Sequence, residues 1–120
     1  MTSRELEDRL IKFSIDIILL SVDHDQVFAK EHLSKQLIRS ATSVALNYGE
    51  AQGSSSSRDF IHKMRICLKE LRESLVNLKI QQGAFLIKDD QNLLKAIDEN
   101  NQLISIFVTS IRTAEKNLKS

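Results

Sequence analysis

The amino-acid sequence predicts an all-α protein, an antiparallel four-helix bundle with up-down-up-down topology. The 120 residues include no proline, three glycines and 5% aromatic residues, a composition that favours long helices over strands joined by turns. Apolar residues recur at helical spacing in four segments, and the stretches between these segments are short. With 42% hydrophobic residues, a chain of this length can bury a core, and a single domain over residues 1–120 is expected.

The first helix is expected from about Arg4 to Val22, with Asp23 to Gln26 ending it. Its apolar residues at coiled-coil-like spacing are Leu6, Leu10, Phe13, Ile17 and Leu20. Four more aliphatic residues occupy its remaining faces, namely Ile11, Ile15, Ile18 and Leu19. A helix that is apolar nearly all round needs more than one neighbour, so this helix either lies deep in the bundle or meets another subunit.

The second helix, from about Glu31 to Gln52, carries two stripes at helical spacing. The apolar stripe is Leu33, Leu37, Ala41, Val44, Tyr48 and Ala51. A separate polar band consists of Gln36, Ser40, Ser43, Asn47 and Glu50. Both stripes stop at a short linker, residues 53–57, which is rich in serine. Ser56 and Asp59 have the spacing of a helix-capping pair, which predicts that the third helix begins there.

The third helix is expected to end near Gly83, because glycine accepts positive backbone dihedrals without penalty. Its predicted core stripe is Phe60, Met64, Cys67, Leu71, Leu75 and Leu78. Asp89 can cap a fourth helix that runs to about Asn117. The residues of that helix expected to face the core are Leu93, Ile97, Ile104, Val108 and Ile111. Asn100 and Asn101 interrupt this repeat, and a polar interruption of this kind can fix helix register.

The second and third helices carry a pattern that resembles a known family. Residues 36–50 read Gln-Leu-x-Arg-Ser-Ala-x-Ser-Val-x-x-Asn-x-x-Glu, and Arg58-Asp59-Phe60 follows the linker. Segments 6–10, 59–63 and 110–117 also look like family segments at matching places, so the resemblance covers nearly the whole chain. The family is the 23S rRNA intervening-sequence proteins, also called four-helix-bundle proteins. In one departure, Ala51 stands where the family often has glycine, with Gly53 two places on.

This resemblance implies a four-helix bundle, assembly into a ring of five identical subunits, and a link to nucleic acid. Related proteins include accessory factors of retroelement reverse transcriptases, so a protein partner such as a reverse transcriptase is also implied.

Charge placement gives independent information about function. The formal net charge is only +1, without the basic excess of a dedicated nucleic-acid binder. Residues 58–88, however, carry seven Lys/Arg against three acids, whereas residues 1–29 carry three against six. Five cations of the third helix project to one side: Arg58, Arg65, Lys69, Arg72 and Lys79. This basic stripe is either a surface that contacts phosphates or a solvated helix face.

The polar band of the second helix is interpreted as structural in preference to a ligand pocket. Buried polar groups must be paired, so an ion pair of Glu50 with Arg39 or Arg58 is expected to connect the second and third helices. The predicted structural network comprises Gln36, Arg39, Ser43, Asn47 and Glu50. Such networks inside bundles commonly specify register.

Enzymatic chemistry finds little support in the sequence. Di-iron bundles need two Glu-x-x-His motifs, whereas the nearest match here is Asp59 followed by His62. Cys67 lies on the apolar stripe and is interpreted as a core residue. A glycine-rich phosphate loop is missing, and neither a cofactor nor a metal is expected. The lone cysteine fits a reducing cytoplasm, and the first apolar run is too short to span a bilayer.

The sequence therefore predicts a non-enzymatic, oligomeric, cytoplasmic four-helix bundle. Nucleic-acid binding through the basic stripe is the leading hypothesis, with RNA and DNA both open. The alternative is a structural adaptor that binds proteins and no nucleic acid.

Overall fold

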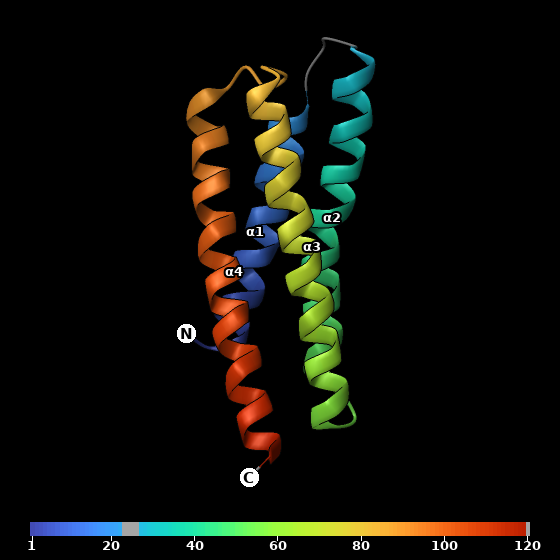
Figure 1. Cartoon of the computed structure of the whole chain (residues 1–120), viewed down its shortest axis with the longest axis vertical. Helices are drawn as coiled ribbons and strands as arrows, with labels where there is room; N and C mark the ends of the chain where they lie inside the picture. The colour runs from blue at the N-terminus through green and yellow to red at the C-terminus, as the bar shows by residue number, and fades with distance from the viewer. Residues whose placement is uncertain (23–26, 120) are drawn as a thin grey trace.

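Four helices follow one another along the chain and pack as antiparallel neighbours. The computed structural model describes residues 1–22 and 27–119. The helices are α1 (Ser3–Ser21), α2 (Phe28–Gln52), α3 (Ser57–Gly83) and α4 (Asp90–Lys119). Each reverses the direction of the one before it, and the bundle is 52 Å long and 21 Å across (Figure 1). The predicted all-α, up-down-up-down bundle is confirmed.

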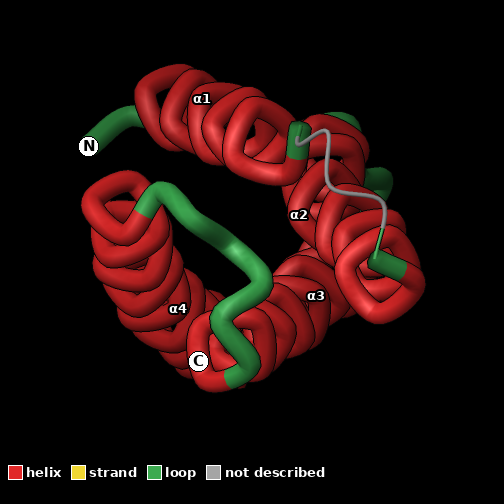
Figure 2. Tube along the Cα trace, turned by 90° about the horizontal axis from the view of Figure 1, so that it is seen from above, coloured by secondary structure: helices red, strands yellow, loops and turns green. Residues whose placement is uncertain are grey.

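The order of the helices around the bundle decides which faces are exposed. α3 packs between α2 and α4, and α1 lies diagonally opposite α3 and packs on α2 and, less extensively, on α4 (Figure 2). Between α1 and α4, the guanidinium of Arg9 donates to the Glu99 carboxylate through Nε at 3.2 Å. No described helix is both long enough and apolar enough to cross a membrane.

Side-chain caps begin three of the helices. The Thr2 hydroxyl accepts from the Glu5 N–H at 3.0 Å, and the Glu5 carboxylate accepts in return from the Thr2 N–H. The predicted cap of α3 is confirmed, because the Ser56 hydroxyl accepts from the Asp59 N–H at 3.1 Å. The predicted cap of α4 is confirmed as well, since Asp89 accepts from the backbone N–H of Asn92. This bond, together with one from the Asn92 side chain, lowers the pKa of the Asp89 carboxyl.

Two helix boundaries differ from the prediction. α2 begins at Phe28, about one turn before the predicted start at Glu31. Its N-cap residue is Val27, whose side chain cannot accept a hydrogen bond, so the sequence carries no capping signal at this position. The prediction that Asp23 to Gln26 ends the first helix concerns a segment outside the described residues.

Gly83 is the last residue of α3, as predicted, but the reason given for it was wrong. Among described residues no glycine has a positive φ; Phe85 does, at 58°. The Leu86 N–H donates to the Gln81 carbonyl at 2.9 Å, and the Phe85 N–H donates to the Gln82 carbonyl at 3.2 Å. These two bonds form a Schellman motif with Phe85 in the left-handed position. The pairing of the last carbonyls, rather than a glycine, therefore ends α3.

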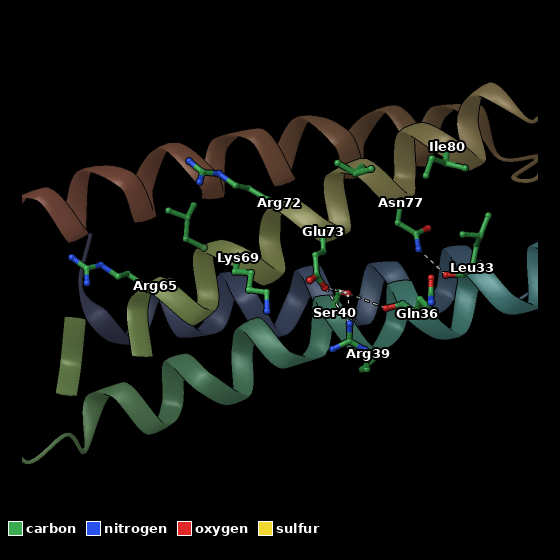
Figure 3. Close-up of a pocket in the computed structure, with 12 residues that line it drawn as sticks. Leu33, Gln36, Arg39, Ser40, Arg65, Lys69, Arg72, Glu73, Asn77 and Ile80 are labelled. Carbon is green, nitrogen blue, oxygen red and sulfur yellow. Dashed lines mark hydrogen bonds and ion pairs between the residues drawn. The ribbon is translucent and has the colours of Figure 1, made fainter. Parts of the chain in front are cut away.

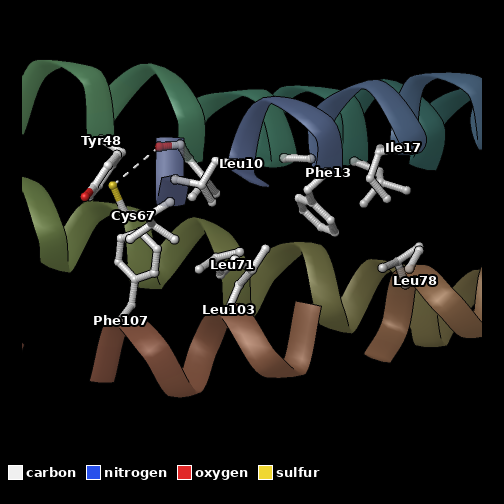
Figure 4. Packing of buried hydrophobic residues seen from close by; sticks show 14 of the residues in the cluster. Leu10, Phe13, Ile17, Tyr48, Cys67, Leu71, Leu78, Leu103 and Phe107 are labelled. Atoms are coloured by element: carbon white, nitrogen blue, oxygen red, sulfur yellow. Dashed lines mark hydrogen bonds between the residues drawn. The ribbon is translucent and has the colours of Figure 1, made fainter. Parts of the chain in front are cut away.

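The hydrophobic core runs the length of the bundle and draws on all four helices (Figure 4). The ring of Tyr48, near the end of α2, meets the ring of Phe107 of α4 edge to face, with centroids 5.8 Å apart. Most of the predicted stripe of α3 is buried, whereas Phe60 and Leu75 are only partly so.

The core-facing stripe of α4 was only partly predicted. Leu93 and Ile111 are buried as expected, but Ile97, Ile104 and Val108 are half-exposed. The other residues that α4 buries are Ala96, Asn100, Leu103 and Phe107. The buried set recurs at spacings of three or four residues, and Asn100 holds one of its core positions, so treating this asparagine as an interruption displaced the predicted stripe.

Asn100 is fully buried and joins α4 to α3. With its amide in the orientation that pairs both polar atoms, the NH₂ donates to the Leu71 carbonyl at 3.0 Å and the oxygen accepts from the Leu75 N–H at 3.2 Å. The side chain thus spans one turn of α3. Asn101 is exposed.

We predict that the thiol of Cys67 is unreactive in the folded protein. It is fully buried, its sulfur donates to the Val44 carbonyl, and burial raises its pKa to about 12. Reaction with a chromogenic disulfide reagent at neutral pH should proceed at the rate of unfolding, and denaturant should make it immediate. Complete reaction of native protein on mixing would contradict this placement of Cys67.

The same thiol gives stability a pH dependence of known sign. An unfolded thiol ionises near its ordinary pKa of 9.0, whereas the folded thiol holds its proton to about pH 12. The folded state therefore binds more protons in this window, and the free energy of unfolding should fall as pH rises through it. Tyrosine and lysine side chains also titrate between pH 9 and 12, so the effect of the thiol is measured against the variant Cys67→Ala. The difference in denaturant midpoint between wild type and this variant should become smaller as the pH rises.

Candidate functional site

The basic stripe predicted on the third helix forms one exposed face of α3, called here the basic face. All five of its residues, Arg58, Arg65, Lys69, Arg72 and Lys79, are exposed. α3 has this single outward face because α2 covers one of its sides and α4 covers another. The seven-residue spacing of four of these cations places them about 10.5 Å apart along the helix axis.

A shallow groove of about 810 Å³ runs along the outward surface of α3 to its contact with α2 (Figure 3). Its lining includes four cations, Arg39, Arg65, Lys69 and Arg72, and the acidic residue Glu73. The amides of Gln36 and Asn77 also line it, as do the aliphatic side chains of Leu33, Leu68, Val76 and Ile80. We name this feature the α2–α3 groove.

The groove unites part of the basic face with part of the polar band. Sequence reasoning treated the two stripes separately, since spacing within one helix does not say which faces of two helices adjoin. Three residues of the basic face and Gln36, Arg39 and Ser40 of α2 line the same hollow. Lys79 lies outside its lining, and Arg58 lines a smaller hollow with Arg65 and Glu115.

The cations of the groove differ in their partners. Arg65 forms an ion pair with Glu115 of α4 at 3.1 Å. In the part of the chain that the structure describes, Lys69 and Arg72 have no carboxylate within ion-pair distance. Because two long cationic side chains next to each other are without an acidic partner, their charge is available to an anion in solution.

Two of the five residues of the polar band, Ser40 and Asn47, bond to the backbone of their own helix. The Ser40 hydroxyl donates to the Gln36 carbonyl at 3.0 Å, and the Asn47 amide donates to the Ser43 carbonyl at 2.8 Å. These residues satisfy their own polar groups, whereas the Gln36 amide stays exposed along the groove.

The expected partner of Glu50 was wrong. Glu50 accepts from the Lys63 ammonium at 3.0 Å, rather than from Arg39 or Arg58, and its side chain is 62% exposed. Antiparallel pairing explains the difference. Glu50 is near the end of α2 and faces the beginning of α3, while Arg39 is about 16 Å back along the helix and faces Glu73.

Arg39, a member of the predicted structural network, also connects α2 to α3. Its Nη2 donates to the Glu73 carboxylate at 3.1 Å, and its Nη1 lies 3.5 Å from Glu70. Glu70 is the buried member, with 11% of its side chain exposed. About one turn further along α3, the Asn77 amide donates to the Leu33 carbonyl of α2 at 2.9 Å.

Other candidate chemistry is sparse. Over residues 1–22 and 27–119, no three His, Cys, Asp or Glu side chains gather closely enough to hold a metal ion. His62 is exposed, and Cys67 is buried in the core. No second site of the kind expected for metal or acid-base chemistry stands out in this part of the chain.

Comparison with known proteins gives a consistent result. The family model described as "23S rRNA-intervening sequence protein" matches residues 5–106. A crystal structure of a protein of unknown function from the S23 ribosomal protein family of Bacteroides thetaiotaomicron superposes with a TM-score of 0.82. The two are 27% identical, and the match covers 93% of this chain and 99% of the other. A search of curated proteins finds no significant match.

We predict that Glu50 and Arg39 contribute unequally to stability. Glu50→Ala should change the free energy of unfolding by less than about 1 kcal/mol, because an exposed ion pair contributes little. Arg39→Ala leaves the carboxylate of Glu70 buried without its partner and should cost about 1–3 kcal/mol. Urea unfolding of both variants measures the difference. Equal costs, or a larger cost for Glu50→Ala, would refute this assignment.

Proposed function

This chain belongs to the family of 23S rRNA-intervening sequence proteins, and we propose that it is a non-enzymatic four-helix-bundle protein that binds RNA or DNA backbone through the basic face of α3. The observation that carries this proposal is the position of Arg65, Lys69 and Arg72. These three exposed cations share one groove, and Arg39 joins them from α2.

The chemistry of the groove favours phosphates over bases as the contacted groups. Arg and Lys on a surface bind phosphate oxygens, and these contacts position a nucleic acid without reading its sequence. Recognition of single-stranded bases commonly uses aromatic side chains as stacking platforms, and none lines this groove among the residues described. We therefore expect binding with little sequence preference.

The neighbouring helices limit how closely α3 can approach the bases of a nucleic acid. Its neighbours α2 and α4 flank it along the bundle, so it presents a broad surface rather than a projecting recognition helix. A helix that enters the major groove must protrude far enough to reach base edges. Contact with the outer phosphates is what this arrangement permits.

A second candidate function is a protein-binding adaptor, which the exposed aliphatic residues favour. Val76 and Ile80 are exposed beside the cations of the groove, and α1 exposes a further set consisting of Ile11, Ile15, Ile18 and Leu19. Exposed apolar surface of this kind typically marks an interface between proteins. Under this alternative, no nucleic acid binds.

We also propose that the chain assembles into a cyclic homo-oligomer. The sequence also places Ile61, Ile66, Val76 and Ile80 off the core stripe of α3, which predicts a contact with another subunit. Val76 and Ile80 are exposed as this prediction requires, whereas Ile61 is buried and Ile66 is partly buried. The exposed apolar face of α1 is the stronger support, because α1 packs only its other side on α2 and α4.

Light scattering tests the proposed assembly. A pentamer, the state that the family resemblance implies, would give about five times the 13.7 kDa mass of one chain. A monomer at micromolar concentration would contradict assembly altogether. Two variants of α1 lower the net charge by one, namely Ile15→Glu on its exposed apolar face and Lys12→Gln at an exposed polar position. Together they separate loss of apolar contact from a local charge effect, and only the first should dissociate the oligomer.

Salt dependence tests the proposed binding. If Arg65, Lys69 and Arg72 contact phosphates, the logarithm of affinity should fall with the logarithm of salt by about 0.7 for each contact to a single strand. Replacing all three by Gln should weaken binding to every sequence alike and reduce the slope by about 2. The fold should be retained, because all three are exposed.

The matched control replaces three exposed cations away from α3, namely Arg4, Lys12 and Lys95, by Gln. It removes the same total charge and should leave the salt slope nearly unchanged. Fluorescence anisotropy with a labelled structured RNA and a labelled single-stranded DNA provides the measurement. Absence of binding to either at low salt would exclude the nucleic-acid function and favour the adaptor.

A further inference from the structure

We propose that Arg39 and Ser40 of α2 form a further phosphate position in the α2–α3 groove, and that Glu73 of α3 occupies it in the free protein as a competing anion. This inference rests on the proposed nucleic-acid function. It adds the phosphate position formed by Arg39 and Ser40 of α2 to the binding surface of α3. It also identifies the Glu73 carboxylate as an anion that competes with phosphate for this position.

The contacts of Glu73 define the position. Its carboxylate accepts from Arg39 Nη2 at 3.1 Å and lies 3.4 Å from the Ser40 hydroxyl. Figure 3 shows the Glu73 side chain extending from α3 toward these two donors on α2. The Arg39 guanidinium can donate to a phosphate oxygen as it does to the carboxylate, since both are anionic acceptors. The Ser40 hydroxyl has a single proton, which also reaches the Gln36 carbonyl at 3.0 Å, and it can turn this proton toward the bound anion.

The exposure of the pair indicates that phosphate can displace Glu73. The side chains of Arg39 and Glu73 are 59% and 42% exposed, and an ion pair so open to water gains little from its charges. A phosphate that also contacts neighbouring cations of the groove adds charge-assisted hydrogen bonds. The exchange therefore favours the ligand when several phosphates bind together.

Glu70 has a different role from Glu73, although both approach Arg39. Its carboxylate is nearly buried and 3.5 Å from Arg39 Nη1. It can hold the guanidinium in place after Glu73 is displaced, because its contact uses the other terminal nitrogen. Glu70 is thus a positioning residue, and Glu73 is the competitor.

Glu73 also affects its neighbours on α3. It follows Lys69 by one turn and lines the same groove as Lys69 and Arg72. Its negative charge lowers the positive potential that these cations present to a phosphate. Removing that charge should therefore strengthen binding both at Arg39 and along the basic face.

The test compares Glu73→Gln with wild type by anisotropy, using a fluorescein-labelled oligouridine over a range of salt concentrations. We expect affinity to rise on the order of fivefold at low salt, and the salt slope to steepen by about 0.7, the value for one added contact. The double variant Glu73→Gln with Arg39→Gln should lose both changes. Thermal melting confirms that each variant is folded.

The control is Glu31→Gln, which removes an acid of the same type from an exposed ion pair with Lys35, outside the groove. It should leave affinity near the wild-type value. An equal gain in Glu31→Gln would show that only net charge matters and would overturn the inference.

The outcomes separate this inference from the function on which it rests. If wild type binds in a salt-dependent way and Glu73→Gln binds no more tightly, the proposed competition by Glu73 is refuted. The proposed binding through the basic face would then still stand. If Glu73→Gln binds the oligouridine and wild type does not, the proposed competition by Glu73 is supported, and its carboxylate prevents binding in the wild-type protein. Lack of binding by both would overturn the inference together with the proposed function.

Discussion

The antiparallel packing of α3 between α2 and α4 is the constraint on which the rest of the molecule depends. One register accounts for the contacts along the α2–α3 interface: Glu50 meets Lys63, Val44 meets Cys67, Arg39 meets Glu73, and Leu33 meets Asn77. Each step back along α2 is matched by a similar step forward along α3. In this register most apolar residues of α3 lie in the core, and its cations share the outward face with Val76 and Ile80.

The diagonal relation of α1 and α3 separates the two surfaces to which function is assigned. The exposed aliphatic residues of α1 belong to the helix that lies diagonally opposite α3. Assembly through α1 would therefore leave the basic face of α3 open, and several copies would add their potentials. The proposed nucleic-acid binding and the proposed self-assembly are compatible in this geometry because they would use different helices.

Most of the fold could be predicted from the sequence, because long uninterrupted periodicity and capping residues are local signals. What failed depends on contacts between helices. The stripe of α4 was misplaced at Ile97 and Ile104 because that helix has aliphatic residues on adjacent faces, and spacing alone cannot say which face is buried. The partner of Glu50 depends on the register between two helices, which spacing within one helix does not encode. The cations of α3 were identified correctly as one exposed face, but Arg39 and Glu73 became part of the site only when the two helices were placed together.

The central claim is that nucleic acid binds the outward face of α3 and the adjoining rim of α2. Amide chemical-shift mapping by NMR during titration with a short single-stranded RNA tests it most directly. We expect the shifts to concentrate at Arg65, Lys69 and Arg72 and, across the groove, at Arg39 and Ser40, while the exposed face of α1 stays unchanged. Shifts concentrated on α1, or spread evenly over the bundle, would contradict it.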